Sequence, residues 1–369
     1  MKTNIFRNVV AATLLLVSMG GASVAHAITD PIPQVAGTYA LRFDVANGDQ
    51  RAYILRLPAG YNPARAVPYP LVVMFHGGGQ SATSFSNRPG MQRMATLADQ
   101  QGKIVVFAQG TLGVSVVMPG TWDTVGAADL LYGEELVDEL AASPNLNADP
   151  TRVLAAGFSM GGHFVHTLGA GTPATFRAIG VVSGFYGSDT VEPPPPPVGT
   201  LLPVFIVHGD ADGTVPILGG DPVSFGGLRL SALDSFNRWY TNDGCTTFVA
   251  LPVLPPATHT FRFTNCQAGI AIRKIKFTTV FGLGHLWPIA ADGYDASATA
   301  PIESSPRARS SSTRAAAVGS ARKSWLANAS SYAACAVFFD SPSCFSSART
   351  GGNRLPAGSA PLAISRCTL

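Results

Sequence analysis

The stretch R-V-L-A-A-G-F-S-M-G-G-H, residues 152–163, points to the fold class of this chain. The apolar run predicts a strand over 152–156, and the residues after the glycine pair at 161–162 predict a helix over 163–169. Between them, G-F-S-M-G (157–161) matches G-x-S-x-G, the pattern of a sharp strand-to-helix turn that presents a serine. Because the chain has 39 glycines in 369 residues, this pattern alone is weak evidence, and the strand–turn–helix setting gives it weight.

Apolar runs and amphipathic segments alternate on both sides of this turn. Continuous apolar runs are typical of strands buried on both faces, and apolar residues at helical spacing indicate helices. The alternation predicts an α/β fold, with a mostly parallel sheet covered by helices on both faces. The predicted strands are 51–57, 71–75, 104–107, 152–156, 178–182, 204–207 and 270–280, and the predicted helices are 91–101, 130–142, 163–169 and 228–240.

Composition and charge exclude several classes of protein. With 46% hydrophobic and 13% charged residues, the chain can bury a large core, which excludes disordered, collagen-like and small disulfide-stapled proteins. The net charge of +3 arises at the C-terminal end, since 301–369 carries 8 basic and 2 acidic residues while 28–300 carries 15 basic and 20 acidic ones. We therefore expect no nucleic-acid partner.

The N-terminus has the parts of a secretory signal peptide. Lys2 and Arg7 precede an apolar stretch over 9–17, and A-H-A at 25–27 offers a cleavage site. We predict a signal peptide over 1–27 and a secreted or periplasmic protein, with a buried N-terminal helix as the alternative. No later segment reaches about 18 uninterrupted apolar residues, so no membrane span is expected.

A serine nucleophile needs an acid and a base, in the chain order Ser, Asp, His. Ser159 would attack, and His285, in the loop after the last predicted strand, would take and return the proton. Asp212 would hold the imidazole, because it follows the strand 204–207 at the sheet edge where α/β proteins place their sites. Asp210 is the alternative carboxylate, with a solvated or loop-capping role.

The glycines of H-G-G-G (76–79) follow the strand 71–75 and can bring a backbone N–H to a substrate carbonyl oxygen. We predict an oxyanion hole formed by the N–H groups of Gly78 and Met160, with Gly77 as the alternative loop donor. His76 is expected to hold the loop by hydrogen bonds. His163 and His166 share a helix face without a third ligand, so no metal is predicted, and no nucleotide-binding glycine pattern implies a cofactor.

Four motifs together resemble the secreted polyhydroxybutyrate depolymerase and feruloyl esterase group of the α/β-hydrolases over about residues 40–290. They are H-G-G (76–78), G-F-S-M-G-G (157–162), H-G-D-A-D (208–212) and G-H-L-W-P (284–288), of which H-x-W-P is the most specific. The resemblance implies the α/β-hydrolase fold and a serine carboxylic-ester hydrolase that acts through an acyl-enzyme without metal or cofactor. It also suggests that Trp122 and Trp287 line the acyl or aromatic pocket, with a place in the core as the alternative.

The cysteines depart from that group, which often has one soon after the H-G of the oxyanion loop. Here that stretch is G-G-Q-S (78–81), while Cys245 and Cys266 bracket a Pro/Thr-rich segment before the last predicted strand. We predict a disulfide between Cys245 and Cys266. The pairing among Cys335, Cys344 and Cys367 stays open.

We divide the chain into a signal peptide (1–27), a catalytic domain (28–300) and a basic tail (301–369) rich in Ser and Ala. For the tail, the alternatives are a disordered extension, a small adhesion module held by a disulfide, or an out-of-frame translation.

The predicted function is a secreted serine esterase that cleaves polymeric or aryl esters and acts as a monomer. Polyhydroxyalkanoate and feruloyl substrates are not separable from these motifs. The alternatives are a prolyl-oligopeptidase-type serine peptidase and a non-catalytic α/β-hydrolase relic with a binding role.

Overall fold

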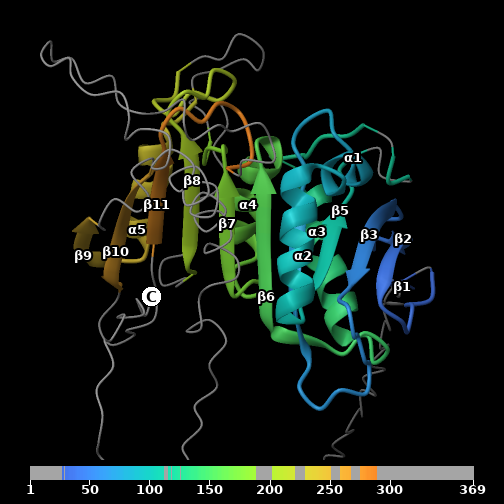
Figure 1. Ribbon diagram of the computed structural model, residues 1–369. Helices are drawn as coiled ribbons and strands as arrows, with labels where there is room; N and C mark the ends of the chain where they lie inside the picture. The colour runs from blue at the N-terminus through green and yellow to red at the C-terminus, as the bar shows by residue number, and fades with distance from the viewer. Residues whose placement is uncertain are drawn as a thin grey trace, which may run out of the picture.

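The computed structural model describes residues 27–28, 30–111, 115–117, 119–124, 126–187, 202–220, 229–250, 258–266 and 275–288. These residues form an 11-stranded sheet with helices on both faces (Figure 1). The strands are β1 (Ala27–Ile28), β2 (Gly37–Asp44), β3 (Gln50–Leu57), β4 (Tyr69–Phe75), β5 (Ile104–Ala108), β6 (Ala148–Phe158), β7 (Ala178–Val182), β8 (Val204–Gly209), β9 (Cys245–Ala250), β10 (Thr258–Cys266) and β11 (Ile275–Val280). The helices are α1 (Ala82–Ser86), α2 (Pro89–Gln101), α3 (Ala127–Ala142), α4 (Met160–Gly171) and α5 (Ala232–Asn242).

The strand order is β1-β2-β3-β5-β4-β6-β7-β8-β11-β10-β9. The central strands β5-β4-β6-β7-β8-β11 pair in parallel. The remaining pairs, β1-β2, β2-β3 and β3-β5 toward one edge and β11-β10 and β10-β9 toward the other, are antiparallel. Parallel neighbours bring the carboxyl ends of β4, β6, β8 and β11 to one edge of the sheet, where the loops after these strands meet.

Alternate residues of the central strands belong to two hydrophobic cores, one on each face of the sheet. Leu71, Val73 and Phe75 of β4 join the core under α3, α4 and α5, while Val72 and Met74 join the core under α1 and α2. In Figure 1, α2 lies in front of the sheet and α4 and α5 lie behind it. Burial on both faces explains why these strands appear in the sequence as continuous apolar runs.

The structure confirms the predicted α/β class and its mostly parallel sheet, with changes at element ends. The helix predicted over 228–240 begins at Ala232, because the Ser231 hydroxyl accepts the N–H of Asp234 and caps the first turn. The predicted helix over 163–169 extends over Met160–Gly171, and the strand over 152–156 extends over Ala148–Phe158.

Strands β1, β2, β9 and β10 and the short helix α1 were not predicted from the sequence. β2 alternates exposed and buried residues and pairs antiparallel with β3, while β9 and β10 form the opposite edge of the sheet. Strands in which polar and apolar residues are mixed lack the continuous apolar run on which the other assignments depended.

Several predictions lie outside the described residues. They are the signal peptide apart from Ala27, the tail over 301–369 with its three cysteines, and residues 270–274 of the last predicted strand. The described chain contains no helix long and apolar enough to cross a bilayer.

Candidate active site

Ser159 occupies a strained turn between β6 and α4. Its φ of 55° and ψ of −121° lie in a region of backbone conformation that residues other than glycine rarely adopt. Its N–H donates to Val182 O at 2.9 Å, and its carbonyl oxygen accepts the N–H of His163 at 2.9 Å. The two flanking glycines are sterically required, because a Cβ on Gly157 would lie 2.1 Å from Gly161 O and one on Gly161 would lie 2.2 Å from Phe75 O.

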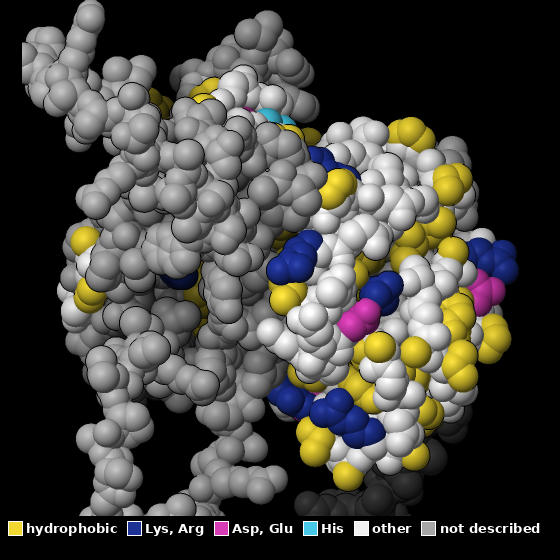
Figure 2. All heavy atoms as spheres, viewed as in Figure 1, with side chains coloured by type: hydrophobic (Ala, Val, Ile, Leu, Met, Phe, Trp, Pro, Cys, Tyr) yellow, Lys and Arg dark blue, Asp and Glu magenta, His cyan; other side chains and the backbone are white. Residues whose placement is uncertain are grey.

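The structure brings together the three residues predicted to form a catalytic triad. His285 Nε2 lies 2.8 Å from Ser159 Oγ, and His285 Nδ1 lies 2.8 Å from Asp212 Oδ2. They come from the loops after β6, β8 and β11, three strands that end at the same sheet edge. On the face shown in Figure 2, histidine atoms reach the surface at the upper edge, and the His285 side chain is 19% exposed.

Asp212 is buried and fully hydrogen-bonded. Its Oδ1 accepts the N–H groups of Thr214 at 2.9 Å and Val215 at 2.7 Å, while its Oδ2 accepts the Nδ1–H of His285. Burial raises the pKa of Asp212, but the hydrogen bonds from His285 and Val215 and the nearby imidazoles outweigh it and hold the pKa below its usual value. Because the carboxylate stays ionised, Nδ1 of His285 carries the proton, and Nε2 is free to accept the hydroxyl proton of Ser159.

Asp210 has a different place. Its Oδ1 accepts the N–H of Gly282 at 2.5 Å, so it joins the loop after β8 to the loop that carries His285. The sequence left two carboxylates as candidates, and the structure brings Asp212 to the imidazole while Asp210 supports the loop.

The glycine loop after β4 lies against the nucleophile. A Cβ on Gly77 would lie 3.4 Å from Ser159 Cβ, and one on Gly78 would lie 3.6 Å from Met160 Cβ. The Met160 N–H is at the first position of α4, where no intrahelical acceptor exists. Gly78 and Met160 are therefore adjacent, as two donors to one oxyanion would have to be.

His76 is buried and holds this loop from inside. Its Nε2 accepts the N–H of Gly110 at 3.0 Å, so Nδ1 carries the ring proton and donates to Gly77 O at 2.8 Å. Burial lowers the pKa of His76 to about 4, more than its bond to Gly77 raises it. This neutral, doubly bonded ring supports the loop-holding role expected from the sequence.

Both tryptophans suggested as pocket walls are buried, which agrees with the core alternative. Trp122 is 2% exposed and stacks on Phe164 with ring centres 4.9 Å apart, and Trp287 is 1% exposed and meets Phe85 edge to face. Trp122 belongs to the hydrophobic core on one face of the sheet and Trp287 to the core on the other face, so their burial favours the core alternative.

Two residues near the triad were given no role in the sequence analysis. His208 is 1% exposed, its Nε2 donates to Val215 O at 2.7 Å and it lies 3.6 Å from Asp212 Oδ2. The Phe158 ring lies 4.9 Å from the His285 ring. Both residues belong to motifs identified in the sequence. Their contacts could not be predicted, because they depend on how the loops fold back onto the sheet.

The predicted disulfide is confirmed: Cys245 and Cys266 are bonded and lie opposite each other on β9 and β10.

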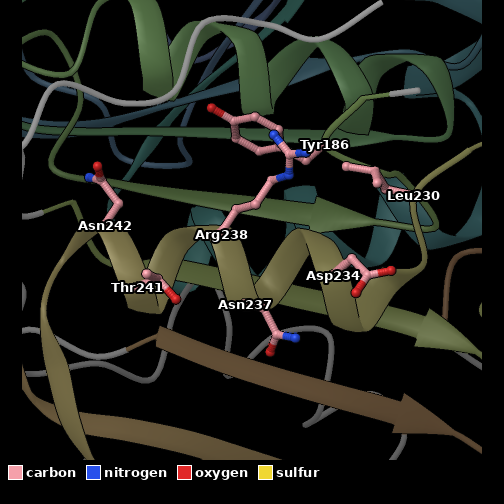
Figure 3. A pocket seen from close by; sticks show the side chains of 7 residues that line it. All are labelled: Tyr186, Leu230, Asp234, Asn237, Arg238, Thr241 and Asn242. Atoms are coloured by element: carbon pink, nitrogen blue, oxygen red, sulfur yellow. The ribbon is translucent and has the colours of Figure 1, made fainter. Parts of the chain in front are cut away.

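A cavity of about 500 Å³ beside α5 is separate from the triad (Figure 3). Its walls include Tyr186 and Arg238, whose side chains point toward one another, and none of Ser159, Asp212 and His285 lines it. Among the described residues, no group of His, Cys, Asp or Glu side chains could hold a metal ion.

Comparisons with known proteins agree with this geometry. Residues 51–191 match the family model described as "Esterase PHB depolymerase". NocK of Nocardia uniformis subsp. tsuyamanensis, named as a candidate esterase, is 29% identical over 69% of this chain and 76% of its own length. Feruloyl esterase C of Emericella nidulans is 26% identical over 65% of this chain and 77% of its own.

The bifunctional acetylxylan esterase/xylanase XynS20E of Neocallimastix patriciarum is 30% identical over 64% of this chain, and the match spans 31% of that longer enzyme. The matched family model contains the serine turn and the glycine loop, and the relatives carry the similarity beyond it. Residues 51–191 therefore match the polyhydroxybutyrate depolymerase family, the rest of the similarity is to named esterases that include feruloyl esterases, and the chain is a serine esterase with the α/β-hydrolase fold.

Proposed function

We propose that this protein is a secreted serine carboxylic-ester hydrolase that acts through an acyl-enzyme on esters of polymers or aryl acids. The observation that carries the proposal is the continuous hydrogen-bond chain from Ser159 Oγ through His285 to Asp212, with both contacts at 2.8 Å. Nucleophile, base and orienting acid are the parts that acyl transfer requires.

In the acylation step, Ser159 Oγ attacks the ester carbonyl carbon while its proton passes to His285 Nε2. Negative charge develops on the carbonyl oxygen, which the N–H groups of Gly78 and Met160 stabilise at the positive end of α4. The tetrahedral intermediate then breaks its bond to the alkoxy oxygen, and the His285 proton goes to the leaving alcohol. Asp212 stabilises the imidazolium that exists between these two transfers.

Deacylation repeats the same steps with water as the nucleophile. His285 takes a proton from the water, the resulting oxygen attacks the acyl carbon, and the proton returns to Ser159 Oγ as the ester bond to the enzyme breaks. The free acid leaves and the triad regains its starting protonation, so the cycle consumes one water for each ester cleaved.

The names of the relatives support esters attached to polymers or aromatic acids as the substrate class. They include enzymes named for acetylxylan and for feruloyl esters, and the matched family is named for polyhydroxybutyrate. The signal-peptide pattern over 1–27 supports export, which would bring the enzyme to polymers too large to enter a cell.

The test compares the exported protein with Ser159→Ala on p-nitrophenyl acetate and butyrate. Loss of the nucleophile is expected to lower kcat by about 10³-fold or more with the fold intact. Equal rates in the two proteins, or no hydrolysis by the parent, would overturn the proposal. Polyhydroxybutyrate film, methyl ferulate and acetylated xylan, assayed side by side, then identify the preferred ester, and the mass of the exported chain locates the cleavage site.

A further inference from the structure

The three glycines of the loop after β4 differ in what their N–H groups contact. The Gly77 N–H donates to the side-chain Oε1 of Gln80 at 3.0 Å, and the Gly79 N–H donates to Gly120 O at 2.8 Å. Within the described part of the chain, the Gly78 N–H meets no acceptor. Gly78 is also exposed, so its N–H is open to a ligand.

The bond from Gly77 to Gln80 has a defined chemistry. A main-chain N–H only donates, so the amide oxygen of Gln80 must face it. The same four residues form a tight turn, because the Gln80 N–H donates to Gly77 O at 3.2 Å. Gln80 thus contacts both main-chain polar groups of Gly77: its side chain accepts the N–H, and its own main-chain N–H donates to the carbonyl oxygen.

Three consecutive glycines have little conformational preference of their own, so contacts from outside must impose their geometry. Main-chain pairing between Gln80 and Gly120 holds one end of the loop, and the His76 ring holds Gly77 O. The peptide group between His76 and Gly77 has two further contacts: the Trp122 indole donates to its carbonyl oxygen, and the side chain of Gln80 accepts its N–H. The side chain of Gln80 is therefore the contact that occupies the Gly77 N–H itself. Without an acceptor there, this N–H would compete with Gly78 for the space beside Ser159.

We propose that Gln80 is a positioning residue of the oxyanion hole, and that it selects Gly78 as the loop donor by accepting the Gly77 N–H. The inference rests on the proposed ester hydrolysis and adds to it a residue that touches neither substrate nor triad. It also explains why the adjacent Gly77, which lies closer to Ser159, is not the donor.

The test replaces Gln80 by Met, which keeps the length of the side chain and removes the acceptor. With p-nitrophenyl acetate, Gln80→Met is expected to lower kcat by about 10- to 100-fold and to change KM by less than about twofold, because a misplaced donor weakens transition-state binding alone. Gln92→Met is the matched control. Its amide makes a side-chain bond to a main-chain atom, Ser86 O at 2.7 Å, on the exposed surface of α2, and its kcat should equal that of the wild type.

Gln80→Glu separates geometry from charge. Its carboxylate still accepts the Gly77 N–H, but it places a negative charge beside the developing oxyanion. Amide hydrogen exchange of peptides that contain residue 77 should therefore show one additional fast amide in Gln80→Met and none in Gln80→Glu, while kcat falls in both.

Unchanged kcat in Gln80→Met, beside a wild type whose hydrolysis depends on Ser159, would overturn the role of Gln80 and leave the proposed function standing. Equal amide exchange in Gln80→Met and Gln92→Met would overturn it as well. Ester hydrolysis that is absent, or that survives in Ser159→Ala, is the separate result that overturns the proposed function.

Discussion

The indole N–H of Trp122 donates to the main-chain oxygen of His76 at 2.7 Å, which joins the segment after β5 to the first residue of the oxyanion loop. The ring is held in place by stacking on Phe164 of α4, the helix that begins at the nucleophile turn. One buried tryptophan thus contacts both sides of the candidate active site from within the core. Its hydrogen bond is directed at the loop that carries Gly78.

Trp122→Phe is expected to lower both stability and kcat. The variant leaves a buried carbonyl oxygen of His76 without its donor, at a cost of about 1–3 kcal/mol in the free energy of unfolding. Loosening of the loop should reduce kcat by about tenfold on p-nitrophenyl esters. Urea unfolding and steady-state kinetics measure the two effects.

Trp239→Phe is the matched control for this variant. Trp239 is also buried, and its indole N–H donates to His166 Nδ1 at 2.9 Å, away from the glycine loop. We expect a similar loss of stability with unchanged kcat. A Trp122→Phe protein that keeps its stability but changes its preference between acetyl and feruloyl esters would instead favour the pocket role suggested by the family resemblance.

Asp212→Asn should inactivate the enzyme while preserving its shape. The amide oxygen would keep the N–H groups of Thr214 and Val215, so its NH₂ group would face His285 Nδ1. That contact favours the imidazole tautomer with hydrogen on Nε2, which cannot accept the proton of Ser159. By analogy with the same change in other triads, kcat should fall by about 10⁴-fold.

Asp210→Asn is the control, since its amide oxygen can still accept the Gly282 N–H. Its kcat should stay within a few-fold of the wild type. If Asp210→Asn lost as much activity as Asp212→Asn, the assignment of the orienting acid to Asp212 would be wrong.

Buried histidines should make the fold sensitive to acid. Burial, with a smaller contribution from the charge of Arg229, lowers the pKa of His163 to about 3, and neither ring nitrogen has a hydrogen-bond partner in the described structure. In the unfolded chain this histidine binds a proton near pH 6.5, whereas in the folded protein it stays neutral. Its contribution to the free energy of unfolding is therefore complete above pH 6.5 and is lost as the pH falls toward 3. The slope is about 1.4 kcal/mol per pH unit.

His163→Phe should therefore flatten the acid side of the stability curve. Between pH 7.5 and pH 5, the variant should lose about 2 kcal/mol less than the wild type in urea unfolding. Val165→Ala, at a buried position of the same helix, should lower stability equally at all pH values. Parallel pH curves for His163→Phe and the wild type would show that His163 does not titrate as its burial indicates.

The strength of the sequence evidence differed between parts of the fold. The central strands and the turn at Ser159 were predictable because complete burial requires apolar runs and a strained turn requires glycines at 157 and 161. The choice between Asp210 and Asp212 rested on motif spacing. In the structure it depends on which carboxylate accepts the N–H groups of Thr214 and Val215, and that carboxylate is Asp212. Gln80 gave no signal, because its contact is a side chain that reaches back three residues along the chain.

Reducing the Cys245–Cys266 bond should destabilise the edge of the sheet without direct damage to the triad. The bond closes a loop with a sequence separation of 21 and joins β9 to β10, whereas Ser159, Asp212 and His285 follow β6, β8 and β11. In the chain-entropy model, Cys245→Ser with Cys266→Ser should cost about 3 kcal/mol in the free energy of unfolding. Activity at 25 °C should remain, because strand pairing between β8 and β11 does not involve the disulfide. Urea unfolding of the double variant beside the oxidised wild type measures the cost, and free thiols at both positions in a non-reduced digest of the wild type would contradict the bond itself.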